Sequence, residues 1–196
     1  MDFLNSIILL TNFIIVPGIT YGSQLALGAI GVTLIYGVLR FANFAYGDLM
    51  AFGTMIVILV TWFLQSKGIT FGLLPTALLA LPVGILLTIA VSLFFDKTVF
   101  EYYRNKKSDP VTFIVVSLGI MFVLNAVVRI IIGPNDINFM DGHKFIMKAR
   151  EFKQMTGLNE GLALKSTQVI TLITTIITCS ILFYFLNKTK TGKSMR

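Results

Sequence analysis

The sequence predicts an all-α fold, a polytopic transmembrane helical bundle of about five to six spans with no soluble domain. Hydrophobic residues make up 56% of the 196 residues and charged residues only 13%, whereas soluble domains usually contain about 25% charged residues. The apolar residues gather into blocks of about 20, the length of helix that crosses roughly 30 Å of hydrocarbon. Most charged residues lie in the gaps between these blocks.

Five blocks are long enough to span a membrane, at residues 18–39, 47–64, 72–95, 111–132 and 168–186. A further apolar run, 3–16, precedes Pro17, and proline bends or ends a helix because it lacks an N–H and crowds the preceding turn. This run is therefore either a short N-terminal helix or the first half of one long bent helix. No Lys or Arg precedes Arg40, so the run lacks the basic region of a cleaved signal peptide. We interpret residues 1–196 as a single transmembrane domain.

The Lys and Arg residues between the blocks predict the orientation, because cytoplasmic loops carry an excess of them. Arg40, an expected loop at 96–110 and the last nine residues together hold nine. The opposite side would carry six Lys and Arg residues, which are Lys67 and those of an outer loop at 133–167. That outer loop is too long for a simple turn, so we expect a small surface helix or a hairpin within it.

Several classes of function are disfavoured by what the sequence contains. The net charge of +7 does not indicate nucleic acid, since the basic residues lie in the gaps and in the tail. Cys179 and His143 are each the one residue of their kind, and phosphate-binding loops, HExxH motifs and metal-spaced clusters are not found. We therefore predict no enzyme chemistry, no catalytic residue, no metal and no cofactor, with ATP hydrolysis on a separate subunit if it is used.

Asp48 is the most informative polar residue, because a carboxylate at mid-membrane costs about 2.5–3.5 kcal/mol and needs a partner or a wet cavity. It lies in the stretch NFAYGDLMAFG, residues 43–53, at the start of an apolar block. Asn43 and Asp48 could cap that helix, a contribution of about 1 kcal/mol. Alternatively, Asp48 faces a substrate. The sequence leaves both interpretations open.

Other polar or small residues inside the blocks could serve either helix packing or transport. Small residues on one helix face let helices approach closely in lipid, and we expect this packing role at Gly18, Gly22, Gly28 and Gly31. Gln24 is a weak candidate for a transport pathway. Asn125 stands one turn before Arg129, whose side chain we expect to reach the outer interface.

Three strings resemble the permease subunits of branched-chain amino acid ABC transporters. YGSQLALGAIGVTLIYGVLRFANFAYGDLMAFGTM, residues 21–55, matches the family's helix rich in small residues, a YG near its end and then N-F-A-[HY]-G-[DE]. VSLGIMFVLNAVVRIIIGPND, residues 116–136, and the ending KTKTGKSMR resemble two later segments in the same order. The family also continues through further transmembrane helices, so this chain is similar to the amino-terminal part of a permease.

The resemblance implies a subunit of a bacterial-type cytoplasmic (inner) membrane importer for branched-chain or related amino acids. Its partners would be a second permease, cytoplasmic ATPase subunits, a periplasmic substrate-binding protein and the lipid bilayer, with no nucleic acid. The pathway or gating candidates are Asn43, Tyr46, Asp48, Gln24 and Asn125, and the ATPase-coupling candidates are Gly192, Lys193, Met195 and Arg196. Urea or short-chain amide permeases share these strings, and the residues also fit a stand-alone ion-coupled carrier or a membrane scaffold.

Overall fold

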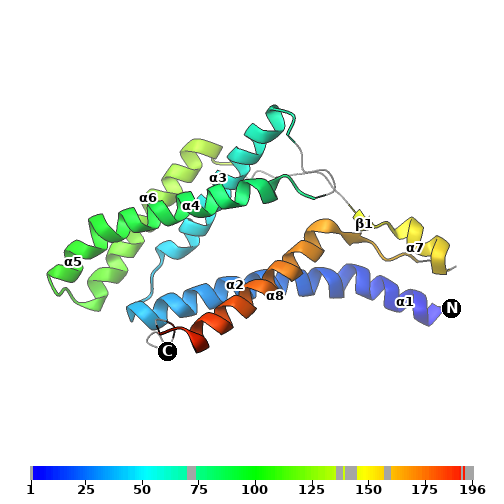
Figure 1. Cartoon of the computed structure of the whole chain (residues 1–196), viewed down its shortest axis with the longest axis horizontal. Helices are drawn as coiled ribbons and strands as arrows, with labels where there is room; N and C mark the ends of the chain where they lie inside the picture. The colour runs from blue at the N-terminus through cyan, green and yellow to red at the C-terminus, as the bar shows by residue number, and fades with distance from the viewer. Residues whose placement is uncertain are drawn as a thin grey trace. The chain divides into compact units, whose positions relative to one another are not determined.

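The fold of the chain, known from a computed structural model, is almost entirely helical (Figure 1). The structure describes residues 2–69, 74–135, 139, 145–156, 160–190 and 192. Five helical runs among these residues are long and apolar enough to cross a membrane: Phe3–Leu39, Ala45–Ser66, Ala77–Asn105, Pro110–Ile132 and Ser166–Lys188. The all-α prediction is confirmed, with five spans.

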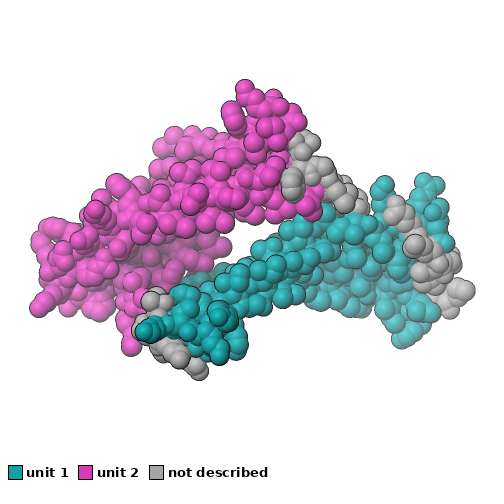
Figure 2. Space-filling model, in the orientation of Figure 1, with its two compact units in different colours: residues 1–31, 142–196 teal, residues 32–141 magenta. Residues whose placement is uncertain are grey.

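The chain divides into two compact units, one of residues 1–31 with 142–196 and the other of residues 32–141 (Figure 2). The first unit contains α1 (Asp2–Leu10), the π-helical turn η1 (Thr11–Ile15), the start of α2 (Val16–Leu39), and α8 (Ser166–Lys188). The second contains α3 (Ala45–Ser66), α4 (Ala77–Phe95), the π-helical turn η2 (Asp96–Phe100), α5 (Glu101–Asn105) and α6 (Pro110–Ile132). That the whole chain forms a single membrane domain stays a prediction.

Pro17 does not end the first helix. Helix α1, the turn η1 and helix α2 follow one another without a break, so the run at 3–16 is the first part of one long helical segment. The N–H of Val16 donates to the carbonyl of Thr11, five residues earlier. A wide turn of this kind is a common way for a helix to accommodate the missing N–H and the bulk of a proline ring.

The segment at 133–167, predicted to be an outer loop, contains a short helix and a pair of strands, whereas its side of the membrane stays a prediction. Strand β1 (Phe145–Met147) pairs antiparallel with β2 (Leu164–Lys165), and the short helix α7 (Ala149–Thr156) lies between them in the chain. The Ala163 N–H donates to Asn12 Oδ1 at 3.3 Å. This bond ties the segment that leads into α8 to the π-helical turn η1.

The second unit is built on α3, which packs against both α4 and α6. Ala45, Ile120 and Leu124 form its buried centre. An ideal Cβ at Gly53 of α3 would lie 2.6 Å from Thr88 Oγ1 of α4, and one at Gly84 would overlap Val57 of α3. The two glycines therefore allow α3 and α4 to approach closely.

The predicted loop at 96–110 is wrong over most of its length. Residues Asp96–Asn105 continue α4 through η2 and α5, and only residues 106–109 connect to α6. The charges indicate a loop, but Val99 and Phe100 pack against the buried centre of the unit. The rings of Phe100 and Phe113 also stack at 6.5 Å between centroids. Tertiary packing of these apolar side chains keeps the segment helical.

Basic residues of the second unit gather around the connection between α5 and α6, and which side of a membrane they face stays a prediction. The segment from the end of α5 to the start of α6 carries most of the basic residues of 96–110. The Tyr102 hydroxyl accepts a hydrogen bond from Lys106 and raises the pKa of that lysine. Lys106 therefore keeps its charge at neutral pH.

Much of the apolar surface of the five long helices is not covered by the described residues. At most 17% of each apolar window is buried, and Leu86, Ile130 and Phe183 are largely exposed. Helices that are apolar around their whole circumference fit a hydrocarbon environment.

Candidate functional site

The corner between α2 and α3 is shaped by Asn43. Its side-chain Oδ1 accepts from the Ala45 N–H at 3.1 Å, and its carbonyl accepts from the Tyr46 N–H at 3.4 Å. Asparagine favours such turns because its short side chain can bond the backbone two residues on. Arg40, just after the end of α2, has a φ of 60°, which turns the chain at the cost of a left-handed conformation. The turn interpretation of Asn43 fits these bonds.

The start of α3 lies well within the length of α6 and not at its end. The Phe44 N–H donates to Ser117 Oγ at 3.2 Å, and Ser117 is about 10 Å into α6. Asn125, the partner of Asp48, is about 10 Å before the other end of α6. Asp48 is therefore placed beside the apolar length of a neighbouring span, deeper than its position at the start of its own helix suggests.

Three polar side chains connect α3 to α6. Asn125 Nδ2 donates to Asp48 Oδ1 at 3.0 Å, and Arg129 Nε donates to Asn125 Oδ1 at 2.8 Å. Asp48 thus bonds to the neighbouring helix and does not cap its own. We call Asp48, Asn125 and Arg129 the polar trio. Arg129, expected to reach toward the outer interface, donates back to a residue one turn earlier.

The two charges of the polar trio are held apart by the amide between them. Among the described residues, the ion pair within 4.0 Å joins Arg104 to Asp96, and Asp48 with Arg129 is not such a pair. Asn125 donates to the carboxylate and accepts from the guanidinium, so it compensates each charge in part. In a medium of low dielectric constant, such charges have strong interactions with any further charged group that enters.

A cavity of about 250 Å³ adjoins the polar trio, and we call it the charged cavity. Its apolar wall consists of Ala51, Ile58, Val128 and Ile132, and the rest is lined by the polar trio with Gly133, Pro134 and Asn135. Asp48, Asn125 and Val128 are half-buried, whereas Arg129, nearest the end of its helix, is exposed. The charged cavity therefore combines two opposite charges with an aliphatic wall.

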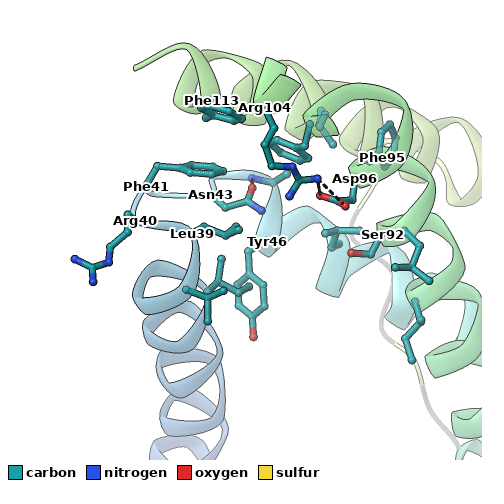
Figure 3. Close-up of a pocket in the computed structure, with 18 of the residues that line it drawn as sticks. Leu39, Arg40, Phe41, Asn43, Tyr46, Ser92, Phe95, Asp96, Arg104 and Phe113 are labelled. Carbon is teal, nitrogen blue, oxygen red and sulfur yellow. Dashed lines mark hydrogen bonds and ion pairs between the residues drawn. The ribbon is translucent and has the colours of Figure 1, made fainter. Parts of the chain in front are cut away.

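A larger cavity of about 860 Å³ lies at the other end of the second unit (Figure 3). It includes Asn43 and Tyr46, with Phe41 and Phe113 stacked at 5.2 Å between ring centroids. Arg104 donates to both carboxylate oxygens of Asp96 at 3.0 Å, as the dashed lines in Figure 3 show. We call it the aromatic cavity. Arg104 and Asp96 pair with each other and are about half exposed, while Arg40 also lines this cavity. The smaller charged cavity is the better candidate site because Asp48 and Arg129, which line it, are bridged by Asn125 and not paired with each other.

The sequence candidates are therefore divided between several places. Asn43 and Tyr46 line the aromatic cavity, while Asp48 and Asn125 line the charged cavity. Gln24 is exposed on α2 in the other unit. A Cβ on Gly18, Gly22 or Gly28 would meet no atom within 4 Å, and Gly31 is half-buried on the same helix. The roles proposed for these residues stay predictions.

Sequence reasoning missed three positions that organise the site. Ser117 is fully buried and holds the start of α3, and Gly53 and Gly84 set the approach of α3 to α4. Each is a lone small residue within an apolar helix, which is a weak signal before the partner helix is known. The position of Arg129 near the end of its span could be predicted, but its bond to Asn125 could not.

The predicted coupling segment is described only at Gly192. Its N–H donates to Thr189 Oγ1 at 3.0 Å, and a Cβ there would overlap the Phe185 carbonyl. Glycine thus allows the chain to fold back on the end of α8. Lys193, Met195 and Arg196 lie outside the described residues. Across the part of the chain that the structure describes, no three His, Cys, Asp or Glu side chains could hold a metal ion together.

The chain matches one protein family along most of its length. The family model described as "Branched-chain amino acid transport system / permease component" matches residues 14–196. The high-affinity branched-chain amino acid transport system permease protein LivH of Escherichia coli is 25% identical over 183 residues, which cover 91% of this chain and 56% of LivH. LivH of Salmonella typhimurium is 24% identical, again over 91% of this chain and 56% of LivH.

A third relative matches a shorter part. The permease protein BraD of the high-affinity branched-chain amino acid transport system of Pseudomonas aeruginosa is 38% identical over 55 residues, or 28% of this chain and 18% of BraD. The chain thus spans little more than half the length of the LivH proteins that it matches. No solved structure matches it with significance.

Proposed function

Because the chain belongs to the permease-component family of branched-chain amino acid transport systems, we propose that it is a membrane-spanning subunit of an ABC importer for branched-chain or related amino acids. It is a multi-pass protein of a bacterial-type cytoplasmic membrane, with five apolar helices. The match of the family model to residues 14–196 carries the proposal. The polar trio supports it, since charges within apolar spans commonly mark a solute pathway.

The partners that we propose follow from the same family. Substrate would arrive on a periplasmic binding protein, a second permease would complete the pathway, and cytoplasmic ATPase subunits would drive alternating access. The sequence has no phosphate-binding loop of its own, which fits a subunit that relies on a separate ATPase. The coupling candidates Gly192, Lys193, Met195 and Arg196 would contribute to the contact with that ATPase.

One observation favours a second candidate, a stand-alone ion-coupled carrier. Asp48 is a half-buried carboxylate beside the apolar length of α6, and such carboxylates bind coupling ions or protons in many carriers. Urea or short-chain amide import is the alternative within the ABC class. An amino acid importer and a urea or amide importer differ in whether the solute carries charged groups. The carrier differs from both because an ion gradient, and not ATP, supplies its energy.

Uptake in proteoliposomes tests these candidates. The full-length protein, purified with its co-expressed neighbours, is expected to retain an ATPase and to import leucine only with ATP inside and the binding protein outside. The control replaces the catalytic glutamate of the ATPase, and it should remove uptake without changing assembly. Leucine uptake by the full-length protein without an ATPase, driven by an ion gradient, would contradict the proposal, as would import of urea but not leucine.

A further inference from the structure

We propose that the charged cavity binds the zwitterionic head group of an α-amino acid, with Asp48 taking the ammonium group and Arg129 the carboxylate. The aliphatic wall of the cavity takes the substrate side chain. This inference rests on the proposed function and names the residues that would recognise the solute on its way through the membrane.

The direction of the two hydrogen bonds in the polar trio supports this assignment. The Asn125 amide places its NH₂ group against the Asp48 carboxylate at 3.0 Å and its oxygen against Arg129 Nε at 2.8 Å. An α-amino acid also carries a nitrogen donor close to an oxygen acceptor, one bond further apart than in the amide and with full charges. It can therefore lie alongside Asn125 with its ammonium group toward Asp48 and its carboxylate toward Arg129.

Both charged side chains have bonding capacity beyond the bonds to Asn125. A carboxylate accepts at two oxygens and a guanidinium donates five hydrogens, whereas the bonds within the trio engage Asp48 Oδ1 and Arg129 Nε. Charge-assisted bonds to a zwitterion would use that capacity, and they are stronger than bonds between neutral groups. The arrangement therefore suits a solute with two opposite charges.

The size and wall of the cavity restrict the solute further. A volume of about 250 Å³ lies below the roughly 300–1,000 Å³ of clefts that hold drug-sized ligands. A cavity of this size therefore suits a small solute better than a drug-sized one. Ala51, Ile58, Val128 and Ile132 provide no hydrogen-bonding side chain, so the wall suits a hydrocarbon side chain.

The same chemistry disfavours urea and neutral amides. A site with charged groups rejects a solute that leaves those groups unpaired, because desolvation is then not compensated. A solute with one charge should satisfy only one end of the polar trio. The proposal therefore predicts a graded response, with leucine above its singly charged analogues and urea last.

The test compares singly charged probes with matched charge-removing variants. The melting temperature of the purified full-length protein is measured against rising concentrations of leucine, leucinamide, 4-methylpentanoate and urea, since a ligand that binds the folded state raises it. Leucinamide keeps the ammonium group and 4-methylpentanoate keeps the carboxylate. We expect leucine to stabilise the wild-type protein at the lowest concentration.

Each charge-removing variant should lose its response to one of the singly charged probes. Arg129→Gln should raise the leucine concentration for half-maximal effect by about tenfold or more, as expected when a charge pair is truncated, and should keep the response to leucinamide. Asp48→Asn should lose leucinamide and keep 4-methylpentanoate. Arg129→Lys, which keeps the charge, should retain more of the leucine response than Arg129→Gln, and if Arg129→Gln folds poorly, Asp48→Asn still tests the proposal. Arg104→Gln, in the aromatic cavity, should leave all responses unchanged.

Two outcomes would overturn the inference. One is a wild-type protein whose melting temperature does not respond to leucine, and the other is a leucine response that is equal in the wild type and in both variants. If the complete transporter still imports leucine with ATP in either case, the proposed function stands and the charged cavity is not the recognition site. If it imports urea and not leucine, the proposed function itself fails.

Discussion

Gly53→Ala is expected to destabilise the protein by about 1–3 kcal/mol, the usual cost of adding a methyl group to a filled contact. The new Cβ would lie 2.6 Å from Thr88 Oγ1, while the Cβ and Cγ2 of Thr88 would be 3.7 Å away. The clash is therefore with one hydroxyl group. Thr88→Ala in the same protein should remove it and restore most of the stability.

Thermal unfolding of the full-length protein in detergent measures this effect. Gly47→Ala is the matched control, because it lies in the same helix and an added Cβ would meet no atom within 4 Å. Alanine there should be neutral or stabilising by up to about 1 kcal/mol, given its higher helix propensity. Two results would show that the close contact of α3 with α4 is wrong. One is an equal loss of stability in Gly53→Ala and Gly47→Ala, and the other is a Gly53→Ala defect that Thr88→Ala does not reduce.

Ser117→Ala is the second change with a large expected effect, about 0.5–1.5 kcal/mol, the usual net worth of a hydrogen bond. Ser117 is fully buried, and its Oγ accepts from the Phe44 N–H at 3.2 Å. Alanine would leave that N–H unpaired at the start of α3. Since the start of α3 places Asp48 opposite Asn125, the leucine response of the charged cavity should weaken as well.

Hydrogen exchange at residues 43–46, together with the melting temperature, measures the loss. Exchange of the Phe44 amide should become faster in Ser117→Ala, because the bond that protects it is gone. Thr54→Ala is the control, since its exposed hydroxyl donates within its own helix, to the Met50 carbonyl. A surface change of this kind usually costs less than about 0.5 kcal/mol. Unchanged exchange at Phe44 in Ser117→Ala would rule out the bond to Ser117.

The helices could be predicted because their signals are local. The blocks at 47–64, 111–132 and 168–186 lie within α3, α6 and α8, since the number of consecutive apolar residues sets the length of a span. The block at 72–95 overlaps α4, which begins at Ala77, and residues 70–73 lie outside the described residues. The prediction of a loop at 96–110 failed because charges are visible in a sequence, whereas the packing of Phe100 against Phe113 is not.

The candidate site could be predicted only in part. Asp48 could be selected because a carboxylate in an apolar block needs compensation, and Asn125 with Arg129 could be placed one turn apart on a single span. The sequence left open whether Asp48 caps its helix or faces away from it. Its bond to Asn125 joins residues 77 positions apart, and no pattern within a single helix indicates such a pair.

The sequence by itself determined that this is an all-α membrane protein and which strings relate it to a permease family. These properties depend on composition, on the length of apolar blocks and on the order of short motifs. Only the tertiary structure decided that Asp48 meets Asn125 and that Arg129 completes the polar trio. The physical reason is that Ser117 fixes the start of α3 against α6, while Gly53 and Gly84 let α4 approach α3, and contacts between helices depend on both partners at once.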